Sequence, residues 1–262
     1  MPHKDKSMKK SRSFSAHAKK TEAASKAKRK TAKTPVTPKP RSAVIQKKTA
    51  AKPTKKVTGK QLSNLAAADQ SARPKAQLLN SVVTYEGPLF RVQRDTLIEP
   101  NGRKSIRDVI RHNGSVVILA IDATKSKRDP WIVMERQYRH AANQYLWELP
   151  AGKLNVGEDP LAGAQREMEE ETGYRARKWK LQVEYFASPG FLGESMKVFL
   201  AEGLIAGEAH PEADEQIEFR LVKLSEVLKA IDKGAIIDGK TLTSVQLFAR
   251  QLSRKLAHKH KK

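Results

Sequence analysis

The feature that most limits how this chain can fold is the uneven distribution of its charge. Residues 1–80 carry 22 Lys and Arg but only 3 Asp and Glu, residues 81–250 carry 24 and 25, and residues 251–262 carry 5 and none. The formal net charge of +23 therefore belongs to the two ends of the chain. A large positive charge is typical of nucleic-acid binders, but here that inference applies to the ends and not to the nearly neutral central part.

The basic N-terminal segment has few apolar side chains to bury. Residues 1–78 are rich in Lys, Ala, Thr, Ser and Pro, so apolar burial cannot offset the entropy lost on folding and we expect a disordered tail. Two roles remain open for it: a solvated extension without a specific partner, or a non-specific tether to polyanions such as nucleic acid. Residues 258–262 form a second, short basic end.

Cysteine content and hydropathy exclude several protein classes. The 262-residue chain has no Cys, which excludes a disulfide scaffold, a Cys-ligated zinc site and a thiol nucleophile. No apolar run approaches the roughly 18–20 residues of a transmembrane helix, and no apolar core of a secretory signal is present. We therefore expect a cytoplasmic protein with no membrane segment.

From about residue 79 the sequence changes to short apolar-rich segments separated by turns. Apolar and polar residues alternate over 89–99, and Asn101-Gly102 follows, which predicts an antiparallel hairpin because both turn residues tolerate positive φ. The β-branched segment 115–122 predicts a buried strand. Further strands are predicted at 131–139, 179–187, 196–203 and 216–223.

Helices are predicted only in the second half of the chain. Asp159 can cap the free N–H groups of a helix, Pro160 suits its first position, and Gly173 suits its end. The preceding segment 148–159 is predicted as a loop. Two later helices are predicted, one capped by Ser225 and ending before Gly234, and one running from about Thr241 toward residue 257. These elements predict an α+β fold in which helices flank a mixed sheet.

The chemistry is concentrated on the first predicted helix. Glu167, Glu170 and Glu171 stand at i, i+3 and i+4, so their carboxylates share one face and repel one another. A hard divalent cation such as Mg²⁺ would reverse that repulsion; a solvated acidic helix face is the alternative. The adjoining stripe can pack against the sheet, and it consists of Leu161, Ala164 and Met168.

The wider spacing separates these alternatives. Gly152 is followed after five residues by Glu158 and after seven more by Arg166-Glu167-Met168-x-Glu170-Glu171-x-Gly173. This pattern resembles the Nudix box at every fixed position, with Tyr174 where a smaller aliphatic residue is usual. The resemblance to Nudix hydrolases covers roughly residues 80–250. It implies an N-terminal antiparallel strand region over 79–114, which helps to form a homodimer, and a Nudix domain of the α/β/α sandwich type over 115–257.

The resemblance also implies roles for the residues of the box. The family hydrolyses a nucleoside diphosphate linked to another moiety, and its box carboxylates, here Glu167 and Glu171 with Glu170, hold Mg²⁺ or Mn²⁺. The carbonyl oxygen of Ala151 is implied as a further metal ligand. Arg166 is implied to orient a Glu, with support from Glu158, while Gly152 and Gly173 are structural.

Two stretches outside the box narrow the substrate. Residues 188–194, SPGFLGE, and residues 136–153 resemble the ADP-ribose pyrophosphatase branch, which includes GDP-mannose and other nucleotide-sugar pyrophosphatases. Alone, Pro189-Gly190 would indicate only a turn. The implied substrate-binding residues are Arg139 at the phosphate, Glu148 near the terminal ribose, and Pro189 and Gly190.

Hydrolysis also needs a general base for the attacking water. The box carboxylates are assigned to metal, so the base should come from the acidic loop 210–218. In the resembling enzymes a Glu of this loop is the base or a late metal ligand. We predict Glu215 for this role, with Glu212 second and Asp214 as a solvated neighbour.

The resemblance further implies a homodimer in which an aromatic side chain of the partner stacks on the base. Tyr85 or Phe90 could do this, or could pack in the core. The predicted activity is metal-dependent hydrolysis of ADP-ribose or a related nucleoside diphosphate sugar. The alternatives are a GDP-mannose or broad nucleotide-sugar pyrophosphatase, a hydrolase of RNA ends or mutagenic nucleotides, and a nucleic-acid-binding regulator that uses a Nudix-like domain as a sensor.

Overall fold

The computed structural model describes residues 59–60, 73–88, 90–210 and 216–259. Most of the predicted tail therefore lies outside the described residues. Of the helices in the described part of the chain, none combines the length and hydropathy needed to span a bilayer.

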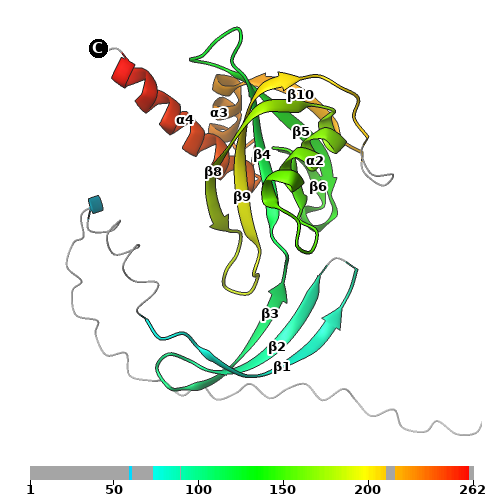
Figure 1. The fold of residues 1–262 in the computed structure, drawn as a ribbon, viewed down its shortest axis with the longest axis vertical. Coiled ribbons are helices and arrows are strands. Elements are labelled where there is room, and N and C mark those ends of the chain that lie inside the picture. Colours follow the sequence, from blue (N-terminus) through cyan, green and yellow to red (C-terminus); the bar gives the residue numbers. More distant parts are fainter. Residues whose placement is uncertain (1–58, 61–72, 89, 211–215, 260–262) are drawn as a thin grey trace, which may run out of the picture. The chain divides into compact units, whose positions relative to one another are not determined.

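The first described strands form a separate three-stranded antiparallel sheet in the order β1-β2-β3 (Figure 1). Its strands are β1 (Gln77–Glu86), β2 (Arg91–Ile98) and β3 (Lys104–Arg111). Pairing of Ile98 with Lys104 and a φ of +80° at Gly102 confirm the predicted hairpin. β1 begins at Gln77, two residues inside the segment predicted as tail.

The second sheet has seven strands, with the path β10-β5-β4-β9-β8. β4 and β9 run parallel, whereas the other pairs are antiparallel, so the sheet is mixed, as predicted. The strands are β4 (Ser115–Asp122), β5 (Trp131–Arg139), β6 (Gln144–Glu148), β7 (Ala151–Lys153), β8 (Arg175–Phe186), β9 (Ser195–Ile205) and β10 (Glu218–Lys223).

Strands β6 and β7 correct the predicted loop. β4 and β5 pair only at Ile121–Ile132 and Asp122–Trp131. Where they separate, β6 pairs with β5 and β7 pairs with β4. Residues 151–153, predicted as loop, are therefore a short strand whose backbone is bonded to the buried β4. Both strands are too short to show a periodicity that sequence reading can detect.

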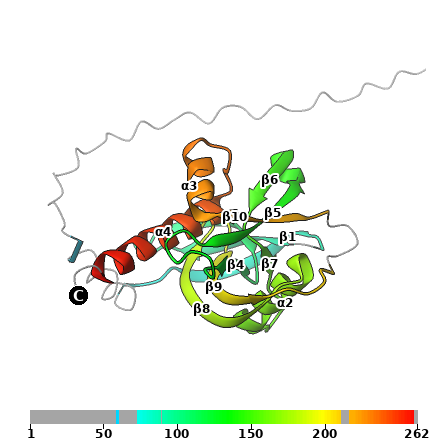
Figure 2. The same ribbon diagram turned by 90° about the horizontal axis from the view of Figure 1, so that it is seen from above.

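Helices cover both faces of this sheet (Figure 2). α2 (Pro160–Thr172) packs on one face, while α3 (Leu224–Asp232) and α4 (Gly239–Lys259) pack on the other. Side chains alternate along β4, so Val116 and Ile118 lie in the core beneath α2, and Val117 and Leu119 lie in the core beneath α3 and α4. This arrangement confirms the predicted sandwich.

The box helix α2 begins and ends as its sequence predicts. The Asp159 carboxylate accepts hydrogen bonds from the N–H groups of Leu161 and Ala162, each at 3.0 Å. Gly173 ends the helix with a φ of +70°. A Cβ on Gly173 would lie 2.6 Å from the carbonyl oxygen of Gly207, so glycine also allows a close backbone approach.

The start of α3 differs from the prediction. Ser225 is the second residue of the helix and does not cap it. Its N–H and its hydroxyl both donate to the carboxylate of Asp129, each at 2.8 Å, so the cap comes from a residue 96 positions away. α4 begins at Gly239, two residues before the predicted Thr241, and Asp238 accepts the N–H of Thr241 at 2.9 Å.

Candidate active site

Arg166 is the centre of the carboxylate cluster on α2. Its Nε and Nη2 bind Glu158 Oε1 and Oε2 at 2.9 and 3.2 Å, its Nη1 binds Glu170 Oε2 at 2.8 Å, and its Nη2 lies 2.8 Å from Glu167 Oε1. The hydrogen bond to Glu158 is the main reason why the pKa of Arg166 lies above its usual value. The same pair lowers the pKa of Glu158, which also accepts the N–H of Asn155. One guanidinium therefore fixes three carboxylates.

Gly152 leaves the space that Glu167 fills. A Cβ on Gly152 would lie 1.9 Å from Glu167 Cδ and within 2.2 Å of both carboxylate oxygens. A Cβ at this position therefore requires the Glu167 carboxylate to move away. The fixed glycine of the box thus serves the position of Glu167, because it lets the carboxylate rest on the backbone of β7.

Glu171 is held by the same strand. Its side chain is buried, and its Oε2 accepts the N–H of Ala151 at 3.1 Å. The helix and β7 therefore bring Glu167, Glu171 and the backbone of Ala151 together. On the next stripe of the helix Ala164 and Met168 are fully buried beneath the sheet, and Tyr174 packs edge-on against Phe219 with ring centres 6.0 Å apart.

One acidic residue beside this cluster was not identified from the sequence. Glu135 lies on β5, is 0% exposed, and has no hydrogen-bond partner for either carboxyl oxygen within the described residues. Burial and, second, the charge of Glu148 raise the pKa of Glu135 to about 8. The signal in the sequence was its position directly after the apolar residues 132–134, two residues from Val133, so that alternation along the strand puts Glu135 on the same face as Val133.

Arg139 and Glu148, which were predicted to contact different parts of the substrate, form an ion pair with each other. The Arg139 guanidinium binds both oxygens of Glu148, at 2.7 and 3.0 Å. Lys240, at the start of α4, also binds Glu148 and lies 3.2 Å from Asp238. Glu148 is almost fully buried, so both cations compensate its charge. Lys240 was not identified from the sequence, because nothing local links α4 with β6.

Pro189 and Gly190 lie in the exposed turn between β8 and β9. The N–H of Leu192 donates to the carbonyl of Ser188 at 3.0 Å, so the segment is a tight turn. Glu194, after this turn, accepts a hydrogen bond from Ser115 at 2.5 Å. This hydrogen bond links the segment 188–194 to the start of β4, and the substrate role of Pro189 and Gly190 stays a prediction.

A basic pocket of about 260 Å³ lies beside the box. Its lining includes the ring of Phe90, one acid, Glu86, which lies 3.8 Å from Arg91, and four basic side chains, Arg91, Arg111, His112 and Lys153. Lys153 follows Gly152 directly, and its carbonyl oxygen accepts a long hydrogen bond from Arg166 Nη2 at 3.4 Å. Positive side chains therefore stand next to the carboxylate cluster, as an anionic ligand requires.

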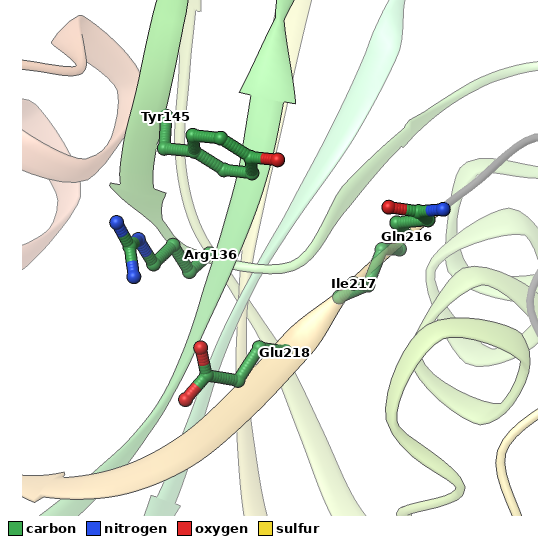
Figure 3. A pocket seen from close by; sticks show the side chains of 5 residues that line it. All are labelled: Arg136, Tyr145, Gln216, Ile217 and Glu218. Atoms are coloured by element: carbon green, nitrogen blue, oxygen red, sulfur yellow. The ribbon is translucent and has the colours of Figure 1, made fainter.

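A second pocket, of about 430 Å³, lies where β5 and β6 approach the start of β10 (Figure 3). Arg136 and Tyr145 line it, with the guanidinium carbon 5.1 Å from the ring centre. Alternation along β5 directs Arg136 away from Glu135 and Arg139. Gln216, Ile217 and Glu218 complete its lining, which shares no residue with the carboxylate cluster.

The predicted general base lies outside the described residues, as do Glu212 and Asp214, because the structure does not describe 211–215. The flanking residues are described. The N–H of His210 donates to the carbonyl of Glu170 at 2.8 Å. His210, the last described residue before this gap, is therefore bonded to the box helix.

The residues present suit a hard divalent cation. Glu167 and Glu171 offer carboxylate oxygens next to the backbone of Ala151, and Glu135 contributes buried oxygens that no donor satisfies within the described residues. In that same part of the chain, no three acidic, His or Cys side chains are already grouped as a metal cage. Arg166 instead holds Glu167 and Glu170, so metal binding requires their rearrangement or further ligands.

Comparison with known proteins agrees with this geometry. A family model described as the NUDIX domain matches residues 111–244, just over half of the chain. A solved structure titled as an ADP compounds hydrolase superposes with a TM-score of 0.61 at 18% identity, over 70% of this chain and 96% of that one. At this identity the likeness supports the fold alone.

Sequence relatives cover most of the chain beyond its N-terminal segment. The methanol dehydrogenase activator of Bacillus methanolicus is 38% identical over 67% of this chain and 92% of its own length. The ADP-ribose pyrophosphatase of Bacillus subtilis is 40% identical over 62% of this chain and 86% of its own length. A GDP-mannose pyrophosphatase of Cronobacter sakazakii is 32% identical over 53% and 78%. The box geometry, the domain match and these relatives together show that the chain belongs to the Nudix family.

Proposed function

We propose that this protein hydrolyses the pyrophosphate bond of ADP-ribose or a related nucleoside diphosphate sugar, releasing a nucleoside monophosphate and a sugar phosphate. The observation that carries the proposal is the cluster in which Arg166 orders Glu158, Glu167 and Glu170 beside a buried Glu171. Two ADP-ribose pyrophosphatases, at 40% and 35% identity, support the choice of substrate.

The charges of the site fit such a substrate. A divalent cation held by Glu167 and Glu171 would neutralise the pyrophosphate and lower the pKa of bound water. We expect Mg²⁺, with Mn²⁺ as a substitute. The pocket lined by Arg91, Arg111 and Lys153 would bind the remaining negative charge, and Phe90 offers a ring for the base.

Glu215 remains our choice for the general base. His210, which precedes this loop in the sequence, donates its N–H to the carbonyl of Glu170 on the box helix. Replacement by Gln should lower kcat by orders of magnitude with less effect on metal affinity. A near wild-type rate in Glu215→Gln would transfer the role to Glu212 or to the box.

The N-terminal sheet supports the proposed homodimer. Every residue of β1 is exposed, and its apolar side chains include Leu78, Leu79, Val82 and Val83. An exposed apolar strand of this kind is suited to packing against the same strand of a second copy of the chain. Light scattering of the full chain should give a dimer, and Val82→Lys should shift it toward monomer; a wild-type monomer contradicts the proposal.

The basic N-terminal segment is proposed as an accessory that tethers the enzyme to polyanions within the cytoplasm. Deletion of residues 1–72 stops before β1 and should leave turnover largely unchanged. Binding of the intact chain to nucleic acid should weaken steeply with salt and should be lost in the deletion variant. Equal binding by both proteins contradicts the tether.

A substrate panel tests the activity itself. Full-length protein with Mg²⁺ should be assayed against ADP-ribose, GDP-mannose and an NDP-glucose, with the products separated by chromatography. The proposal expects the highest kcat/KM for ADP-ribose. Preference for GDP-mannose would favour the alternative that the Cronobacter relative supports, and turnover of none would contradict the assignment.

A further inference from the structure

Glu135 is a buried acid whose carboxyl oxygens have no hydrogen-bond partner from the described backbone or basic side chains. It lies in the middle of β5 on the face that packs against α2, with 0% of its surface exposed. Neither carboxyl oxygen receives a hydrogen bond within the described part of the chain. A buried polar group without a partner costs free energy, so this residue calls for an explanation other than packing.

The neighbouring cations do not provide a partner. Glu148 is paired with Glu135 across β5 and β6, and it takes the two hydrogen bonds of Arg139 and the contact of Lys240. These cations act on Glu135 only through space. Glu148, Arg139 and Lys240 therefore form an ion-pair network that does not include a direct contact with Glu135.

Glu171 is the further side chain that interacts with Glu135. Glu171 comes from α2 and is itself fixed by the N–H of Ala151. Two carboxyl groups from different elements thus interact in a buried place, and apart from Glu171 no hydrogen-bond partner of the Glu135 oxygens is found among the described residues. Only a cation or a shared proton can stabilise such a contact.

We propose that Glu135 binds, together with Glu171, the divalent cation of the Nudix site, so that β5 supplies a carboxylate in addition to those of α2. This inference rests on the proposed metal-dependent function. Two features favour a cation over a shared proton: the oxygens of Glu135 are hard donors, and they interact with Glu171, a residue of the acidic helix cluster.

The test measures metal binding and needs no substrate. Full-length protein is titrated with Mn²⁺, and free Mn²⁺ is followed by electron paramagnetic resonance. Wild type is compared with Glu135→Gln, which keeps the shape but removes the charge, and with Glu135→Met, which keeps a similar volume without polar atoms. Asp95→Asn is the matched control, because Asp95 is also buried but is paired with Arg111 and Ser81 in the other sheet.

We expect the Kd for Mn²⁺ to rise at least about tenfold in either Glu135 variant, and to stay within about twofold of wild type in Asp95→Asn. Circular dichroism identifies which variants fold, and one folded Glu135 variant is sufficient. Wild-type affinity in a folded Glu135 variant would overturn the inference and leave the proposed function intact. Absence of Mn²⁺ binding by wild type would overturn both.

Discussion

The carboxylate of Glu167 rests directly on the backbone of Gly152, where an added Cβ would lie 1.9 Å from its Cδ atom. A single methyl group on β7 is therefore incompatible with the observed position of a proposed metal ligand. This relationship explains, in steric terms, why the box needs a glycine before its helix.

The Gly152→Ala variant should lose activity much more than stability. The methyl group displaces Glu167 by more than an ångström, and a misplacement of that size can cost about 100-fold in rate. Steady-state kinetics and thermal melting measure the two effects. Gly239→Ala is the control, since a Cβ there meets nothing within 4 Å, and it should retain wild-type turnover. Equal rates in both variants would contradict the steric argument.

The Arg166→Lys variant should retain the positive charge but lose the simultaneous contacts with the three carboxylates. A lysine ammonium is a point charge and cannot reach Glu158, Glu167 and Glu170 in the planar geometry of the guanidinium. We expect kcat/KM to fall by about 100-fold. Arg136→Lys, on the opposite face of β5, is the control and should keep its activity. Full activity in Arg166→Lys would mean that charge alone suffices.

The stability that Glu158 contributes should depend on pH. Its pKa is lower in the folded protein than in the unfolded chain, chiefly because of Arg166. The folded state then binds fewer protons, so this contribution is present above the usual carboxyl pKa and is lost as the pH falls through the lowered value. Urea unfolding of wild type and Glu158→Gln should show a difference at pH 7 that shrinks below about pH 4.5. A difference independent of pH would contradict the ion-pair explanation.

The Asp129→Ala variant should destabilise α3 without affecting the box. Asp129 accepts both the N–H and the hydroxyl of Ser225, and loss of a helix cap costs about 1 kcal/mol. Chemical denaturation measures this loss. The double variant with Ser225→Ala should cost little more than Asp129→Ala alone, because the partner is already gone; additive losses would contradict a shared cap.

The sequence was sufficient wherever the determinant of structure is local. The cap at Asp159, the end at Gly173 and the apolar stripe with Met168 lie within one helix, and the turn at Gly102 lies within one hairpin. The boundaries of α2 and the β2–β3 hairpin could be predicted for that reason. The box spacing likewise lies within 22 residues of one loop and helix.

The determinants that escaped prediction are long-range. The cap of α3 comes from Asp129, 96 residues before Ser225, and Lys240 reaches Glu148 across 92 residues. Neither pair leaves a local pattern. Glu135 escaped for a different reason: it stands in the polar second half of β5, WIVMERQYR, where an acid is normally expected at the surface.

The most direct test of the central claim is hydrolysis of ADP-ribose by wild type and Glu171→Gln in the presence of Mg²⁺, with AMP and ribose 5-phosphate quantified by chromatography. The proposed site predicts both products in equal amounts from wild type, and a loss of at least about 100-fold in Glu171→Gln with the fold retained. Equal rates in the two proteins, or no AMP from wild type, would contradict it.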